Sequence, residues 1–258
     1  MAKKYKPIDL SKLRTYSIAD REHKFDARLA ANLADKGATF RAWWDSLPPY
    51  LGAENLRALA SAILAARKAG RPVIFALGAD VVKVGCSPII CDLMERGILT
   101  AVSMNGATAI HDVEVATFGQ TSEEVADTIR DGSFGMVEET PKFFADALSA
   151  APSTDAGLGA AVGAHLVRTA PLNLHLSILS TAARLGLPAT IHTAFGTDTI
   201  HMHAAVAKSD LVARSAMDFR LICSVVADMA PADGSPASGV WVNVGSAVLL
   251  PEIFLQAP

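Results

Sequence analysis

The segment NGATAIHDVEVATFG, residues 105–119, places His111, Asp112 and Glu114 within four positions of one another. A turn-forming Asn-Gly precedes them, so they lie close to the start of an amphipathic stretch. An acid in a first helical turn can stabilise the helix through the helix dipole and have no further function. A histidine beside carboxylates at the end of a strand can also hold a cationic substrate or move protons. We favour the functional interpretation for His111 and Asp112.

A second polar group lies in AFGTDTIHMH, residues 194–203. Asp198 could accept hydrogen bonds from ribose hydroxyls, as acids after strand ends do in dinucleotide sites. It could equally be a turn-forming residue or a helix cap. His201 and His203 are two positions apart and, with His192, would suit a metal-dependent hydrolase. Because no further ligand has convincing spacing, we expect no metal site.

Four short apolar, β-rich runs bounded by Gly or Pro indicate buried parallel strands. Each is followed by a polar loop and then by a helix-like segment. The runs are residues 72–77, 98–104, 188–193 and 239–244, and the helix-like segments are residues 87–97, 111–119, 209–229 and 250–257. Strands alternating with helices predict an α/β fold, a Rossmann-like doubly wound parallel sheet with helices on both faces.

The remaining segments divide the chain into an arm and one domain. Residues 1–25 are charged and aperiodic, which suggests an N-terminal arm or oligomer contact, and residues 26–258 form the expected single α/β domain. Within it, helical periodicity covers residues 27–47, 54–71 and most of 121–150, where Thr121 or Ser122 is a candidate cap. Gly-rich residues 150–165 are expected to be flexible, and residues 230–239 to be a surface loop.

Ligands of open parallel sheets bind beyond the carboxyl ends of the strands. This rule selects four loops rich in Gly and small residues: residues 77–87, 105–112, 194–203 and 244–248. Small residues allow a backbone to approach a phosphate, and helix N-termini offer N–H groups to it. The usual G-x-G-x-x-G is missing, and GLGAAVGAH (157–165) resembles it without a preceding strand. The residues alone leave nucleotide binding open.

Composition narrows the class of partner and the compartment. With 23 basic and 26 acidic residues the net charge is −3, which offers no field for a nucleic-acid backbone. The N-terminus lacks the apolar stretch of a signal peptide, and no apolar run has membrane-spanning length. Cys86, Cys91 and Cys223 are an odd set without metal-site pairing. We therefore expect a cytoplasmic protein with reduced thiols.

The order of these motifs resembles the deoxyhypusine synthase family, and more closely its prokaryotic deoxyhypusine-synthase-like branch. The resemblance runs from about residue 72 to the chain end, and its best segments are residues 85–116, 177–203 and 239–257. It implies NAD bound on a Rossmann-like sheet and hydride removal from a polyamine. It further implies transfer of an aminobutyl group to an enzyme lysine and then to a translation factor. Such proteins are commonly tetramers with sites at subunit interfaces.

Carried over by residue, the resemblance assigns an NAD site to the four loops. Thr197 and Asp198 match the Thr-Asp that contacts the ribose, and Asp112, with His111, falls where the synthases carry acids near the polyamine. The full set of expected NAD-binding residues is Gly78, Ser103, Asn105, Gly106, Thr197, Asp198, Gly245, Ser246 and Ala247.

The chain also departs from the family pattern. Leu250, Pro251 and Glu252 stand where the synthases have Lys-His-His, and the segment with the covalent lysine has no counterpart before Pro258. The domain is therefore expected to be incomplete at its C-terminus, with a partner subunit covering the sheet. The imine relay through that lysine cannot run as in the family.

The expected function is an NAD-dependent, deoxyhypusine-synthase-like transferase that acts on an amine by hydride removal and aminoalkyl transfer. His111, Asp112 and Glu252 are its candidate catalytic residues. Its expected partners are a small amine, an acceptor protein, and further copies of the chain in a homo-oligomer, a dimer or tetramer. Two alternatives stay open: an inactive nucleotide-binding or assembly protein of the same fold, and the metal-dependent hydrolase.

Overall fold

The computed structural model describes residues 4–151, 156–230 and 238–257. The chain divides into two compact units, Met1–Leu59 and Ala60–Pro258. The division thus falls inside a helix, 34 positions beyond the end of the 25-residue arm inferred from charge and periodicity.

The first unit contains little regular structure. Its elements are the 3-10 turns η1 (Leu10–Lys12), η2 (Ile18–Asp20) and η3 (Ala27–Leu29), helix α1 (Phe40–Ser46) and the start of α2 (Leu51–Lys68). The helix expected over residues 27–47 is wrong for most of its length. Gly37 has a φ of +83°, a left-handed conformation that does not continue a helix. Thr39 then starts α1, its hydroxyl accepting from the Ala42 N–H at 3.2 Å.

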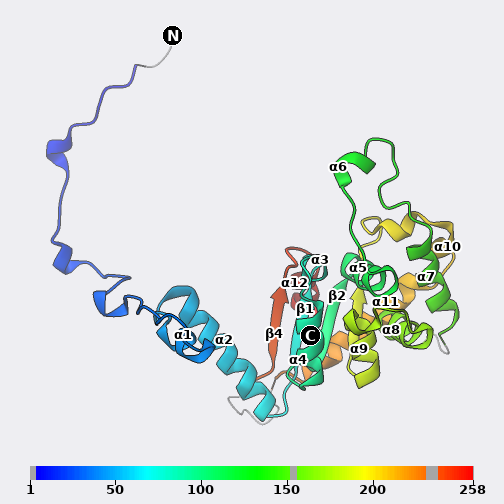
Figure 1. The fold of residues 1–258 in the computed structure, drawn as a ribbon. Coiled ribbons are helices and arrows are strands. Elements are labelled where there is room, and N and C mark those ends of the chain that lie inside the picture. The colour runs from blue at the N-terminus through cyan, green and yellow to red at the C-terminus, as the bar shows by residue number, and fades with distance from the viewer. Residues whose placement is uncertain (1–3, 152–155, 231–237, 258) are drawn as a thin grey trace. The chain divides into compact units, whose positions relative to one another are not determined.

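The second unit is built on a parallel sheet of order β3-β2-β1-β4, with all neighbours parallel. The strands are β1 (Val73–Leu77), β2 (Ala101–Asn105), β3 (Ala189–His192) and β4 (Val240–Val244). Each overlaps one of the four predicted runs, although β2 begins three residues after the start of its run and ends one residue beyond it. The α/β class is therefore confirmed. Because all four strands are parallel, their carboxyl ends lie at one edge of the sheet, as Figure 1 shows for β1, β2 and β4.

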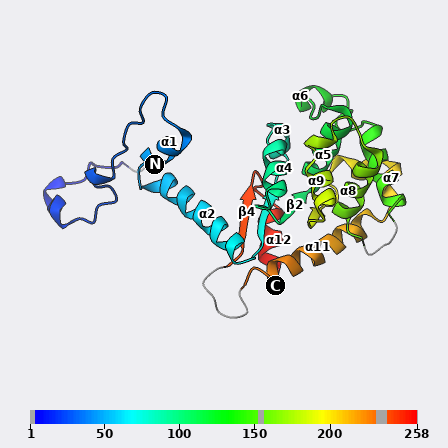
Figure 2. The ribbon, with the colours of Figure 1, turned by 60° about the horizontal axis from the view of Figure 1, so that its bottom comes forward.

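Helices cover both faces of this sheet, as expected of a doubly wound fold. They are α3 (Asp80–Lys83), α4 (Ser87–Glu95), α5 (Gly106–Phe118), α6 (Val125–Thr128), α7 (Glu139–Ser149), α8 (Leu158–Thr169), η4 (Leu174–Leu176), α9 (Ile178–Leu185), η5 (Thr199–Met202), α10 (Ala204–Ala207), α11 (Leu211–Ala227) and α12 (Leu250–Gln256). On one face, Ile74 and Trp241 pack with Ile222 of α11 and Ile253 of α12, which lie close together in Figure 2. On the other, the larger apolar cluster joins the strands to α4, α5, α8 and α9.

Residues 150–165 do not form the flexible stretch that their glycines suggested. Residues 152–155 lie outside the described part of the chain, and α8 begins at Leu158 and is largely buried. A Cβ built on Gly159 would lie 2.0 Å from the carbonyl oxygen of Ala189 in β3. Glycine is used here for close helix–strand packing, not for mobility.

Two smaller expectations concern a helix start and a loop. The start of α6 is capped by Glu124, whose side chain accepts from the Ala126 N–H, and not by Thr121 or Ser122. The surface loop expected at residues 230–239 lies largely outside the described residues.

Within the described parts of the chain, none of the helices combines the length and apolarity needed to cross a membrane.

Candidate functional site

The junction between β2 and α5 contains no loop. Asn105 ends the strand and caps the helix, its side-chain oxygen accepting from the Thr108 N–H at 2.9 Å, and Gly106 is the first helical residue. The Thr108 hydroxyl lies 2.8 Å from the carbonyl oxygen of Leu77 and so ties the ends of β1 and β2 together. The loop expected over residues 105–112 is therefore wrong, and His111 lies in the second turn of α5.

The expected cofactor residues Gly106 and Asp198 meet in space. A Cβ on Gly106 would lie 2.2 Å from Oδ2 of Asp198, so only glycine admits the carboxylate at the N-terminus of α5. Asp198 is 9% exposed, and its Oδ2 has no hydrogen-bond partner within the described residues. Burial raises the pKa of this carboxyl, and His201 opposes the shift. Asp198 Oδ2 is thus an acceptor without a donor, and it lies beside the N-terminus of α5.

A second meeting of loops joins β1 to β4. The Gly78 N–H donates to the Val244 carbonyl at 2.8 Å, and a Cβ on Gly78 would lie 1.8 Å from the carbonyl oxygen of Gly245. The hydroxyl of the buried Ser246 donates to the Val248 carbonyl, whereas Ala247 is exposed. These residues lie at the point where the strand order reverses, the usual position of a ligand crevice in open sheets.

A cavity of about 570 Å³ lies between α5, the segment before α7, and the loop after β3. The segment is residues 119–138, which carries α6 outward from the body of the second unit in Figure 1. Of the expected site residues, His111, Thr197 and Asp198 line this cavity. Its other polar lining residues are Lys83, Glu114, Gln120, Thr121, Ser122, Glu123, Glu139, Thr140 and Thr199.

Asp112 lies outside the cavity, although it follows His111 directly. Successive helical side chains point about 100° apart, and that of Asp112 turns into the core. Its carboxylate accepts from the Ser177 hydroxyl at 2.7 Å and from the N–H groups of Ile178 and Leu179 at 2.8 and 3.2 Å. Complete burial raises the pKa of Asp112 to about 6, against these three hydrogen bonds. The expectation that it shares a pocket with His111 is corrected: its side chain caps α9.

The other expected NAD and catalytic residues also lie outside the cavity lining. Glu252 is exposed in the first turn of α12. Ser103 is buried within β2, and its hydroxyl has no partner within the described residues. The cavity therefore combines one expected catalytic residue, His111, with two expected cofactor residues.

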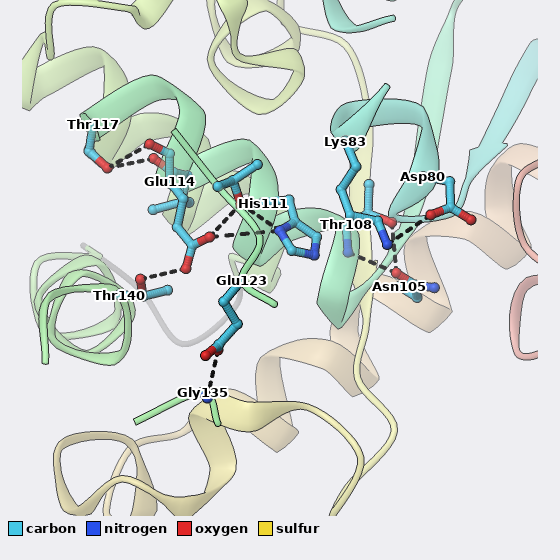
Figure 3. Close-up of polar contacts among 12 residues, drawn as sticks. Asp80, Lys83, Asn105, Thr108, His111, Glu114, Thr117, Glu123, Gly135 and Thr140 are labelled. Carbon is cyan, nitrogen blue, oxygen red and sulfur yellow. Dashed lines mark hydrogen bonds and ion pairs between the residues drawn. The ribbon is translucent and has the colours of Figure 1, made fainter. Parts of the chain in front are cut away.

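The carboxylate of Glu114 is the centre of a polar network in the cavity (Figure 3). It lies one helical turn beyond His111, and the two side chains approach to 3.7 Å. The Thr121 hydroxyl donates to Oε2 at 2.5 Å and also lies 2.5 Å from Nδ1 of His111, while the Thr140 hydroxyl donates to Oε1 at 2.8 Å. Burial alone would raise the pKa of Glu114, but the nearby His111 imidazole and the hydrogen bonds from the two threonines outweigh burial and lower it. The carboxylate is therefore ionised at neutral pH.

The cavity lining carries more negative than positive charge. Four carboxylates line it, Glu114, Glu123, Glu139 and Asp198, against one lysine, Lys83. The Lys83 ammonium already pairs with Asp80 at 2.8 Å. A cationic or amine-bearing ligand fits this charge distribution better than an acidic one.

The histidines proposed for a metal site have separate hydrogen-bond partners. His192 is buried 3.0 Å from the Thr190 hydroxyl, and burial lowers its pKa to about 4. His201 accepts from the Gly196 N–H and stacks on Phe195, while His203 bonds the Gly135 carbonyl. Within the described residues, no three His, Cys, Asp or Glu side chains are grouped so that they could hold a metal ion.

Comparison with known proteins gives structural likeness alone. No protein-family model and no curated protein matches the chain. It is similar to apo ArgZ, an arginine dihydrolase from the ornithine-ammonia cycle in cyanobacteria, with a TM-score of 0.47, 12% identity and coverage of 78% of this chain and 24% of that one. It is also similar to a conserved putative LOR/SDH protein from Methanococcus maripaludis S2, with a TM-score of 0.46, 13% identity and coverage of 91% and 58%. The chain thus spans a quarter of the first structure and rather more than half of the second, and no functional conclusion rests on either.

Proposed function

We propose that this chain is an NAD-dependent enzyme, similar to deoxyhypusine synthase, that removes a hydride from an amine bound in the α5 cavity. The observation that carries the proposal is the pairing of Asp198 with Gly106. A buried carboxylate oxygen without a donor, at a helix N-terminus beside a glycine that admits it, suits the hydroxyl of a ribose. The glycine contact between the β1 and β4 loops provides a further close backbone approach at the same edge of the sheet.

The amine substrate is proposed from charge. Glu114 supplies an ionised carboxylate inside the cavity, and three further carboxylates outnumber Lys83 there. NAD would serve as hydride acceptor, and the residues that would hold it are Gly78, Asn105, Gly106, Thr197, Asp198 and Gly245. Aminoalkyl transfer to an acceptor protein is the finer activity we attach. The cytoplasm, where NAD is available and Cys86, Cys91 and Cys223 stay free, is the compartment we propose.

An inactive nucleotide-binding or assembly protein is the second candidate. It would use the same Asp198 crevice without the chemistry of the cavity. A metal-dependent hydrolase is less favoured, because among the described residues no three His, Cys, Asp or Glu side chains are grouped so that they could hold a metal ion.

Calorimetric titration with NAD tests the first part of the proposal. We expect one saturable site, and a 10- to 100-fold weaker affinity in the Asp198→Ala variant, since a hydrogen bond to a charged group contributes about 1.5–3 kcal/mol. Asp92→Ala, which removes an exposed carboxylate on α4, is the control and should bind like the wild type. NAD should also raise the melting temperature. The absence of both binding heat and a thermal shift at millimolar NAD would refute the proposal.

A screen of diamines and polyamines tests the second part. NADH formation, followed by its near-ultraviolet absorbance, should appear with an amine and be lost in Glu114→Gln, which removes the charge but preserves the shape of the side chain. Saturable NAD binding with no NADH from any amine would instead support the inactive nucleotide-binding protein.

A further inference from the structure

The hydrogen bonds around Glu114 fix the direction in which protons are donated. An ionised carboxylate only accepts, so the hydroxyls of Thr121 and Thr140 must both donate to it. A threonine hydroxyl has one proton to give. Thr121 therefore donates its proton to Glu114 Oε2, and the Thr121 oxygen can only accept hydrogen bonds from its other neighbours.

The remaining neighbour of Thr121 is the imidazole of His111. The 2.5 Å contact between Thr121 Oγ1 and His111 Nδ1 is a hydrogen bond only if the ring nitrogen carries the hydrogen. A neutral His111 is thus held as the Nδ1–H tautomer, and its Nε2 carries a lone pair. Figure 3 shows the second ring nitrogen on the side of the ring away from Glu114, and His111 lines the cavity.

The backbone before α6 is shaped to bring Thr121 to this position. Gly119 ends α5 in the left-handed region, and the non-glycine Ser122 also has a positive φ, of 70°. The Glu123 carboxylate then accepts from the Gly135 N–H at 2.8 Å and closes the segment. Positive φ at a residue with a side chain is unfavourable and persists where surrounding contacts impose it. In this segment the backbone conformation turns the chain back, so that Thr121 lies over the second turn of α5.

We infer that Thr121, Glu114 and Thr140 are positioning residues for His111, which accepts a proton through Nε2 from the ammonium group of the substrate. The inference rests on the proposed function for the identity of the substrate. An ammonium nitrogen has no lone pair and cannot support loss of hydride from the adjacent carbon. Transfer of one proton to Nε2 leaves protonated His111 and the neutral amine, whose lone pair would form the C=N bond of the substrate iminium. Bound NAD would supply the acceptor for the hydride.

The tautomer can be measured without NAD or amine. Nitrogen-15 NMR of the imidazoles, with the His111 signals assigned by their loss in His111→Gln, should show the Nδ1–H form in the neutral wild-type ring. Thr121→Ser keeps the hydroxyl and should keep that form, and Thr121→Val should lose it. An Nε2–H ring in the wild type, or one unchanged in Thr121→Val, would overturn the inference.

The role in proton transfer is tested with any amine that yields NADH. Thr121→Val should lower kcat by about 10- to 100-fold, within the range of general-base effects, with unchanged NAD affinity. Thr121→Ser should restore the rate to within a few fold. Thr117→Val, on α5 with His111, is the matched control, because within the described residues the Thr117 hydroxyl contacts only backbone carbonyls. A Thr121→Val enzyme with an altered tautomer and an unaltered rate would refute the role of His111 as base.

The two proposals fail in distinguishable ways. If no amine yields NADH, the proposed function fails, and the NMR experiment still decides whether Thr121 fixes the ring. Should Thr121→Val not fold, Glu114→Gln gives a second test of the tautomer. Its amide can donate to the Thr121 oxygen, so that His111 Nδ1 no longer has to carry a hydrogen.

Discussion

Asp112 is a buried carboxylate held by three hydrogen bonds to the start of α9. Its pKa is near 3.8 when exposed and about 6 in the fold. Because the folded protein binds this proton more tightly, the resulting stability is complete below about pH 4 and is lost as the pH rises through 6. The side chain at this position cannot titrate in the Asp112→Asn variant. As the pH rises between those limits, the free energy of unfolding of the wild type should therefore fall by about 3 kcal/mol relative to that of the variant. Urea unfolding at several pH values measures the difference.

Asp127→Asn is the control for this experiment, since Asp127 is exposed in α6. Its effect on the free energy of unfolding should be small at every pH. A difference between wild type and Asp112→Asn that does not change with pH would contradict the argument from burial. NAD affinity should be the same in both variants, because Asp112 lies outside the cavity.

Sequence patterns predict which residues lie near one another when those residues share one helix or loop. His111 and Asp198 were predicted as site residues and both line the cavity. Glu114 was within reach of the same reasoning, since positions three apart share a helix face. Thr140 was not, because its contact with Glu114 spans 26 positions and depends on how α7 packs.

Among the helices, α8 shows how a glycine can stabilise a close contact. Gly159→Ala should lower the free energy of unfolding, although alanine favours helix, because the added Cβ would meet the β3 backbone at 2.0 Å. We expect a loss of about 1–3 kcal/mol, measured by denaturant unfolding. Ala164→Gly, at an exposed position of the same helix, should cost about 1 kcal/mol through propensity alone. Stabilisation by Gly159→Ala would show that α8 and β3 do not approach so closely.

The strands were predictable at the level of elements because each is a short apolar run between breakers. All four overlap their predicted runs, and α4, α11 and α12 lie within their predicted segments. The junction after β2 was not predictable, because an Asn-Gly pair in a sequence indicates a turn. In the fold Asn105 caps α5 directly, and the expected loop became two turns of helix.

At the scale of the whole molecule, the first unit exposes many apolar side chains. Those of residues 4–39 that are more than half exposed include Ile8, Leu10, Leu13, Ile18, Phe25 and Leu33. Burial of these side chains against another chain would be favourable. The homo-oligomer expected from the sequence would cover this surface with a second copy of the chain, a contact that no local pattern in the sequence could specify.

Limited trypsin digestion across a range of protein concentrations tests that assembly. The lysines and arginines of residues 4–36 are exposed in the single chain, so dilute protein should be cut there while the second unit persists. If a second copy covers the segment, cleavage should slow as concentration rises, in step with the mass from light scattering. Leu13→Ser with Ile18→Ser should abolish the protection, because it removes apolar area from the contact. Rapid cleavage at every concentration, with the mass of one chain, would rule out a homo-oligomer built on this segment.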